Sequence, residues 1–152
     1  MAADGGANSL QNTGLIPDWI VGDLDSISRK TQNSFNELGC KIIHLADQNS
    51  NDLEKCLDIA ATQKINHIWI SGFEGDRADM LLGLFSLLRA SKMDPIPRLI
   101  GSRQIVFPLL PGRWDFKCRP GEMFSLVHLE DSDISCNLTG LRWGKTEQVI
   151  PA

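Results

Sequence analysis

Two aspartates, Asp23 and Asp25, lie in an acidic loop that reads GDLDS from Gly22 to Ser26. The loop directly follows the apolar run WIV at 19–21, which predicts a short strand. Two carboxylates on an extended segment can face one ion, and Mg²⁺ takes few carboxylates while water and phosphate complete its coordination. A helix cap is the alternative role for Asp25 or Ser26. Capping explains one of these residues but not both aspartates, so the loop predicts a magnesium site.

Further polar clusters follow two later strands, predicted at 41–45 and 67–71. Ligands of open α/β sheets bind outside the carboxyl ends of the strands, so we expect these clusters to converge with the GDLDS loop. Asp52 and Asp79 each begin a predicted helix, where the helix dipole favours an aspartate whatever its function. Arg77 can bind phosphate oxygens with two nitrogens. An ion pair with Asp76 or Asp79 is the alternative, and it needs no ligand.

The elements that would position these loops alternate two periodicities, which predicts an α/β fold with a Rossmann-like parallel sheet and flanking helices. Helices are predicted at 26–39, 52–64 and 78–92, the last buried on more than one face because its leucines are nearly continuous. We expect an α/β domain over 1–101. Short β-prone runs at 104–110, 114–118 and 122–129 predict a small antiparallel β-sandwich domain over 102–152. About seven strands are usual in such a sandwich, so we expect it to be truncated.

Composition excludes several classes of function. The net charge is −4 and Arg29-Lys30 is the longest basic cluster, which argues against nucleic acid as a partner. No apolar run approaches the ~20 residues that cross a bilayer, and the first residues do not resemble a signal peptide, so we expect a cytoplasmic protein. The cysteines form no CxxC pair, which predicts reduced, mostly buried thiols. They are Cys40, Cys56, Cys118 and Cys136.

Five motifs in register resemble the thiamine pyrophosphokinase family. The family reads DGGAN, GDxDS, QDxTDxEKAL, GxxGGRxDH and TGLKW, and the corresponding residues here are 4–8, 22–26, 48–57, 72–80 and 139–143. The resemblance implies a homodimer with active sites at the subunit interface. It also implies transfer of the pyrophosphoryl group of ATP to the hydroxyl of thiamine, which gives thiamine diphosphate and AMP.

The resemblance also implies a role for each matching residue. Asp23, Asp25, Asp52 and Asp79 would be catalytic, and Asp23, Asp25 and Asp52 would hold Mg²⁺. The residues implied for binding ATP and thiamine are Asp4, Asn8, Ser26, Gln48 and Arg77.

The sequence departs from the family pattern at Asn49, Asn51, Asp76 and Met80. Asp76 adds negative charge beside the implied phosphate site, which predicts weaker nucleotide affinity. The family also has a strand before DGGAN and a serine-containing strand and hairpin beyond TGLKW, and we expect both to be missing here. Two alternatives therefore stay open. One is a catalytically impaired relative that binds nucleotide or pairs with another subunit, and the other is a diphosphokinase acting on a pterin alcohol.

Overall fold

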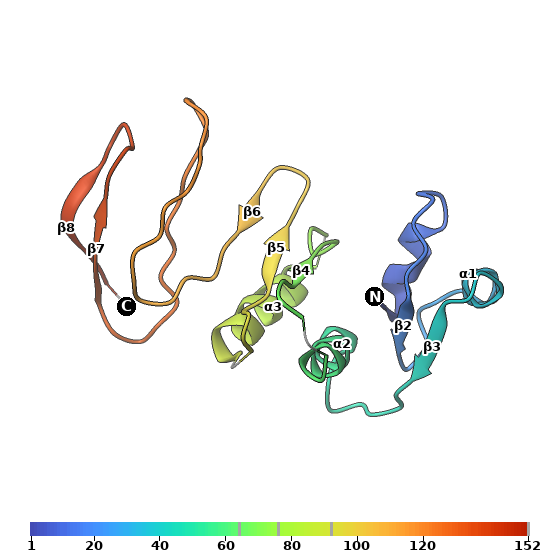
Figure 1. Cartoon of the computed structure of the whole chain (residues 1–152). Helices are drawn as coiled ribbons and strands as arrows, with labels where there is room; N and C mark the ends of the chain where they lie inside the picture. Colours follow the sequence, from blue (N-terminus) through green and yellow to red (C-terminus); the bar gives the residue numbers. More distant parts are fainter. Residues whose placement is uncertain (64, 76, 92, 152) are drawn as a thin grey trace.

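The computed structural model describes residues 1–63, 65–75, 77–91 and 93–151. Three helices, a 3₁₀ helix and eight strands follow one another along these residues (Figure 1). In chain order they are β1 (Ala2–Ala3), η1 (Asp4–Leu10), β2 (Trp19–Gly22), α1 (Arg29–Glu37), β3 (Lys41–His44), α2 (Asp52–Ala61), β4 (Trp69–Ile70), α3 (Ala78–Ala90), β5 (Arg98–Ile100), β6 (Ile105–Val106), β7 (Ile134–Leu138) and β8 (Lys145–Ile150).

The strands form three sheets. The first has the order β1-β2-β3 and is entirely parallel, with Ala2 opposite Ile20 and Ile20 opposite Ile42. In the second, β4 pairs in parallel with β5, and β5 pairs antiparallel with β6. The third is the antiparallel pair β7-β8. β1 lies directly before residues 4–8 and β8 lies beyond residues 139–143, so the expectation that no strand stands at either place is wrong. The predicted fold class is confirmed: parallel strands with helices, followed by a small antiparallel sheet.

The transition at residue 101 falls inside a sheet. Ile105 of β6 lies opposite Ile100 of β5, so the second sheet continues across the predicted domain boundary. The division into domains 1–101 and 102–152 stays a prediction. Within 107–133 the described residues form no strand, so the strands predicted at 114–118 and 122–129 are wrong. That stretch is extended, and Figure 1 shows it running out and back between β6 and β7.

Local hydrogen bonds set the helix starts. Asn51 and Glu54 form a capping box at α2: the Glu54 amide donates to Asn51 Oδ1 at 2.9 Å, and the Asn51 amide donates to Glu54 Oε2 at 2.7 Å. The box explains why α2 begins at Asp52, as predicted. α1 begins at Arg29 instead of the predicted Ser26, because Ser28 is its cap and accepts the Thr31 amide at 3.1 Å.

Two separate clusters make up the core. The first lies around η1, β2 and α1, and consists of Ala2, Ala7, Ile20, Ile27, Phe35 and Cys40. The second joins α3 to β5 through Leu84, Leu88 and Leu99. The prediction that α3 is buried on more than one face is wrong, because Met80 and Leu82 are 58% and 67% exposed. Cys40 and Cys56 are buried, whereas Cys118 is exposed, so burial of the thiols is only partly confirmed.

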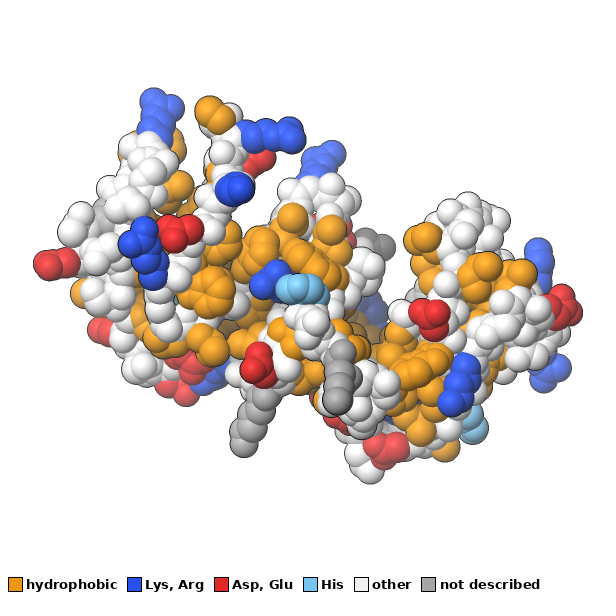
Figure 2. All heavy atoms as spheres, viewed as in Figure 1, with side chains coloured by type: hydrophobic (Ala, Val, Ile, Leu, Met, Phe, Trp, Pro, Cys, Tyr) orange, Lys and Arg blue, Asp and Glu red, His pale blue; other side chains and the backbone are white. Residues whose placement is uncertain are grey.

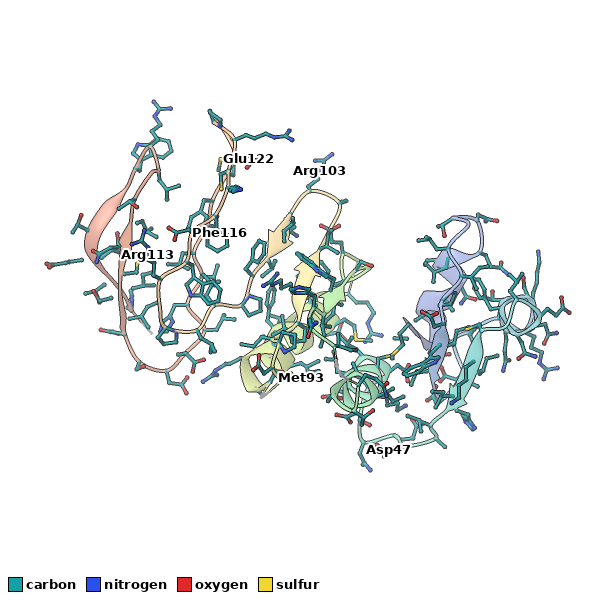
Figure 3. All side chains as sticks on the ribbon, viewed as in Figure 1. Asp47, Met93, Arg103, Arg113, Phe116 and Glu122 are labelled. Atoms are coloured by element: carbon teal, nitrogen blue, oxygen red, sulfur yellow. The ribbon has the colours of Figure 1, made fainter. Side chains whose placement is uncertain are left out.

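A row of aromatic rings ties the extended stretch after β6 to the second sheet. Trp69, Phe107, Phe116 and Phe124 follow one another at centroid distances of 6.1, 5.3 and 6.2 Å. Figure 3 labels Phe116 in this stretch, and Figure 2 shows hydrophobic side chains gathered over β4, β5 and β6. No helix among the described residues is long and apolar enough to cross a lipid bilayer.

Candidate acidic site at the ends of the parallel strands

Asp4 organises the GDLDS loop. Its side chain is 1% exposed, at the point where β1 passes into η1. Asp4 Oδ2 accepts the Ser26 amide at 2.9 Å, and Oδ1 accepts the Ile27 amide at 3.3 Å. These bonds occupy two backbone donors that would otherwise be unpaired near the start of α1. The loop between β2 and α1 is therefore folded around the Asp4 carboxylate.

Asn8, four residues along η1, holds the same loop from its other end. Asn8 Oδ1 accepts the Ser28 amide at 3.0 Å and the Thr31 hydroxyl at 2.8 Å. Its Nδ2 donates to the Ser26 carbonyl at 3.0 Å. The side chain of Asn8 is thus used within the fold, and its predicted contact with nucleotide stays a prediction.

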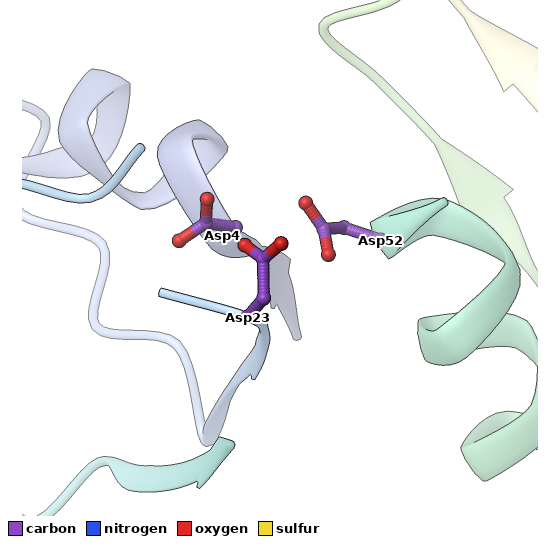
Figure 4. A group of neighbouring side chains, drawn as sticks. All are labelled: Asp4, Asp23 and Asp52. Carbon is purple, nitrogen blue, oxygen red and sulfur yellow. The ribbon is translucent and has the colours of Figure 1, made fainter. Parts of the chain in front are cut away.

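Three carboxylates converge where η1, β2 and α2 meet. One oxygen from each of Asp4, Asp23 and Asp52 lies within 4.8 Å of the others (Figure 4). Asp23 follows β2 and Asp52 is the first residue of α2, so two of the predicted loops meet as expected. We call these three residues the acidic cluster. Asp25 is not among these three, and its Oδ1 accepts the Ser26 hydroxyl at 2.7 Å.

Gly22 allows the three carboxylates to approach. A Cβ atom built at this position would lie 2.6 Å from Asp4 Cβ and 3.0 Å from Asp52 Oδ1. The first contact is far shorter than carbon atoms tolerate, and Asp4 Cβ is fixed by the backbone. The glycine before Asp23 is therefore explained by close approach of two acidic side chains.

Gln48 holds the Asp23 carboxylate. Gln48 Nε2 donates to Asp23 Oδ2 at 2.9 Å, and the Asp25 amide donates to Asp23 Oδ1 at 3.3 Å. The Gln48 bond is the main reason that the pKa of Asp23 lies below its ordinary value. The carboxylate consequently stays ionised to lower pH than a free aspartate, which suits a cation ligand.

We expect Gln48→Leu to make cation binding fail at a higher pH. Without the Gln48 bond the pKa of Asp23 rises, so protons compete for this carboxylate earlier as the pH falls. Titration of the protein with Mn²⁺ at a series of acidic pH values measures the shift. Gln63→Leu, at an exposed glutamine beyond α2, is the matched control. An unchanged pH dependence would show that Gln48 does not control Asp23.

Lys55 is a member of the site that sequence reasoning missed. Its side chain is 4% exposed, and Nζ lies 3.0 Å from Asp52 Oδ1. Burial alone would lower the pKa of Lys55, but the hydrogen bond to Asp52 and the charges of Asp52, Asp23 and Asp47 outweigh it, so the pKa is raised. One feature of the sequence could have indicated this role: Lys55 stands three residues after Asp52, a spacing that places both side chains on one face of α2.

Arg77 and Asp79 pair with each other at the start of α3. Arg77 Nε donates to Asp79 Oδ1 at 3.2 Å, and a second bond joins Arg77 Nη2 to Asp79 Oδ2. Their side chains are 68% and 64% exposed, and the pair lowers the pKa of Asp79. The ion pair between Arg77 and Asp79, given above as the alternative role of Arg77, is therefore present in the structure. Contact of Arg77 with phosphate stays a prediction. Asp76, whose charge was predicted to weaken nucleotide binding, lies outside the described residues.

Fold and site together define an α/β protein whose carboxylates gather at the ends of parallel strands, next to the first turn of a helix. Comparison with known proteins narrows this class. The family model described as thiamin pyrophosphokinase, catalytic domain, matches residues 1–97. The chain belongs to the thiamin pyrophosphokinase family, and the resemblance seen in the sequence is confirmed.

Individual relatives agree with this family. Thiamine pyrophosphokinase of Bacillus subtilis is 27% identical over 146 residues, covering 94% of this chain and 68% of the relative. Thiamine pyrophosphokinase 1 of Oryza sativa is 27% identical over 139 residues, and the match spans 84% of this chain but only 52% of the relative. The crystal structure of the Bacillus subtilis enzyme superposes with a TM-score of 0.79 at 26% identity, over 97% of this chain and 71% of that one.

Proposed function

We propose that this protein is a magnesium-dependent transferase that moves the pyrophosphoryl group of ATP to the hydroxyl of thiamine, giving thiamine diphosphate and AMP. The observation that carries the proposal is the convergence of Asp4, Asp23 and Asp52 in a chain of the thiamin pyrophosphokinase family. Pyrophosphoryl transfer needs little covalent help from a protein. It needs charge neutralisation and correct positioning of the acceptor hydroxyl, and the first of these is what a cation site provides.

The donor set fits Mg²⁺. Carboxylate oxygens are the ligands that this hard cation prefers, and three of them from separate segments lie within 4.8 Å of one another. Asp23 and Asp52 would hold the ion together with Asp4, whose oxygens keep lone pairs beside the backbone bonds that they accept. Asp25 matches the second aspartate of the family motif GDxDS, and on that resemblance we propose that it also binds Mg²⁺. Bound Mg²⁺ would supply neutralisation of phosphate charge in this reaction class.

The remaining residues would serve the substrates. Arg77 would exchange its bonds to Asp79 for phosphate oxygens, since a guanidinium binds either acid with two nitrogens. Gln48, anchored on Asp23, would lie near thiamine, and Asp4, Asn8 and Ser26 would border the nucleotide pocket. Asn51, which replaces the family threonine, still caps α2, so this departure preserves the position of Asp52.

We further propose a cytoplasmic homodimer. Exposed apolar side chains along α3, Met80 and Leu82 among them, support a protein partner, because large apolar patches on a surface mark interaction sites. Sedimentation of the purified protein measures the oligomeric state, and a monomer at micromolar concentration would contradict the dimer.

The decisive assay mixes the purified protein with ATP, Mg²⁺ and thiamine and measures AMP and thiamine diphosphate. Equal yields of both products are expected. Nucleotide binding without AMP would favour the alternative of an impaired family member that acts as a binding or partner protein. A pterin alcohol offered in competition with thiamine tests the other acceptor, and preferential transfer of the pyrophosphoryl group to that alcohol would overturn the assignment of thiamine.

Asp25→Asn is expected to reduce magnesium-dependent turnover roughly hundredfold or more, because a lost cation ligand removes several kcal/mol of charge stabilisation from the transition state. The melting temperature should stay unchanged, since the Asp25 side chain is exposed and its Oδ1 bonds to the neighbouring Ser26. Steady-state AMP release and thermal unfolding measure the two effects. A large loss of stability with full activity in the folded fraction would assign Asp25 a structural role instead.

A further inference from the structure

Lys55 is the only basic side chain that is buried among the residues the structure describes. Most lysines keep the ammonium group in water, because removing it from solvent is unfavourable unless a partner compensates. The partner here is Asp52, whose Oδ1 lies 3.0 Å from Nζ, while the Asp52 side chain itself is 29% exposed. The pair therefore joins a buried cation to a carboxylate that still faces the acidic cluster.

Charges around Lys55 are unbalanced. Asp52 contacts its ammonium group directly, and Asp23 and Asp47 act on it through their charges. Asp4 completes the acidic cluster on the far side of Asp52 from the helix. Carboxylates this close repel one another when all are ionised, and one lysine offsets only part of that repulsion. Bonds from backbone amides and Gln48 hold Asp4 and Asp23, but neither group brings a positive charge.

We propose that Lys55 is the internal counter-ion of the acidic cluster: it holds Asp52 in place when no divalent cation is bound, and it competes with that cation for the same carboxylate. The inference rests on the proposed function for the identity of the site as a Mg²⁺ site. Lys55 is accordingly a positioning residue, because it acts on substrates only through Asp52. Its positive charge limits how tightly the cluster binds a divalent cation, which keeps the site exchangeable.

A purely structural role for Lys55 makes a different prediction. A lysine that only fills space or supports α2 would, when replaced, lower stability equally with and without cation. A counter-ion, when removed, leaves a cluster with greater negative charge. Cation binding then becomes tighter, and the stability lost without cation is regained when cation is added.

The test measures Mn²⁺ affinity by calorimetry, without nucleotide or thiamine, on the full chain. Lys55→Met, which keeps the aliphatic length and removes the charge, is expected to bind Mn²⁺ about tenfold more tightly. Lys55→Arg should stay within about twofold of the parent protein, because it keeps the charge. Lys41→Met, at an exposed lysine on β3, should change nothing. Equal or weaker Mn²⁺ binding by Lys55→Met than by Lys41→Met would overturn the proposal, as would a parent protein that does not bind Mn²⁺.

Thermal unfolding supplies the second readout. In EDTA, Lys55→Met should melt below the parent protein, and saturating Mn²⁺ should close the gap. A gap of the same size with and without Mn²⁺ would overturn the counter-ion role. If Lys55→Met does not fold, Lys55→Gln carries both measurements, because it keeps a donor for Asp52 while removing the charge. These outcomes are independent of catalysis. A shift in Mn²⁺ affinity without AMP production would contradict the proposed function and still support the counter-ion role of Lys55.

Discussion

Replacing Gly22 by alanine is expected to disable the site and destabilise the fold at the same time. The new methyl group would lie 2.6 Å from Asp4 Cβ and 3.0 Å from Asp52 Oδ1, so strand β2 and the start of η1 must separate. Overpacking of a buried position costs about 1–3 kcal/mol, and the displaced carboxylates can no longer share a cation. We expect a melting temperature several degrees lower, and loss of Mn²⁺ binding and AMP release.

Gly83 serves as a control for Gly22, because a methyl group added there would not be forced against a neighbouring side chain. Gly83 lies within α3, and a Cβ atom there would meet nothing within 4 Å. Gly83→Ala should keep activity and raise stability slightly, because alanine is the better helix former. Thermal unfolding and Mn²⁺ calorimetry on both variants make the comparison. Wild-type affinity in Gly22→Ala would mean that the carboxylates do not need the spacing seen in this structure.

Asp4→Ala is expected to have the second large effect. The change leaves the amides of Ser26 and Ile27 without their acceptor, and an unpaired buried donor such as that of Ile27 costs about 1–3 kcal/mol. It also removes one carboxylate of the acidic cluster. Stability, Mn²⁺ affinity and turnover should therefore fall together, unlike in Asp25→Asn, where stability should be kept.

Two further variants sharpen the Asp4 prediction. Asp4→Asn keeps one carbonyl oxygen for a backbone amide, so it should recover part of the stability but not the cation affinity. Asp18→Ala, at an exposed aspartate just before β2, is the control for loss of an acidic residue. Denaturant unfolding gives the free energies. Equal stability of Asp4→Ala and Asp18→Ala would contradict the organising role of Asp4.

Much of the site could be predicted because its residues stand in local patterns. An aspartate after an apolar run that ends in glycine indicates a strand end, and the structure places Asp23 there. The capping residues Asn51 and Glu54 similarly fix the start of α2 and the position of Asp52. Such signals depend on neighbours in sequence, which is why they are readable from one chain.

Features that depend on contacts between residues far apart in the sequence could not be predicted from local patterns. Asp4 bonds to amides 22 and 23 residues further along the chain, and its role in folding the loop follows from that contact alone. The burial of Lys55 depends on how α2 packs, although the residue stands in a helix face that could as well be solvated. The prediction that α3 is buried on more than one face is wrong for a related reason. Its leucines indicate an apolar helix, but the neighbouring elements decide which of these leucines are covered.

The long-range bonds of Asp4 also bear on the order in which the chain acquires its site. During synthesis the N-terminal residues leave the ribosome first, and local units can fold before later segments exist. Asp4 meets Ser26 and Ile27 through contacts that need nothing beyond the start of α1. Asp52 is contributed by α2, a later segment. The nascent chain can therefore bring two of the three carboxylates of its acidic cluster together early, and the docking of α2 brings Asp52 and its counter-ion Lys55 to the cluster in a single event.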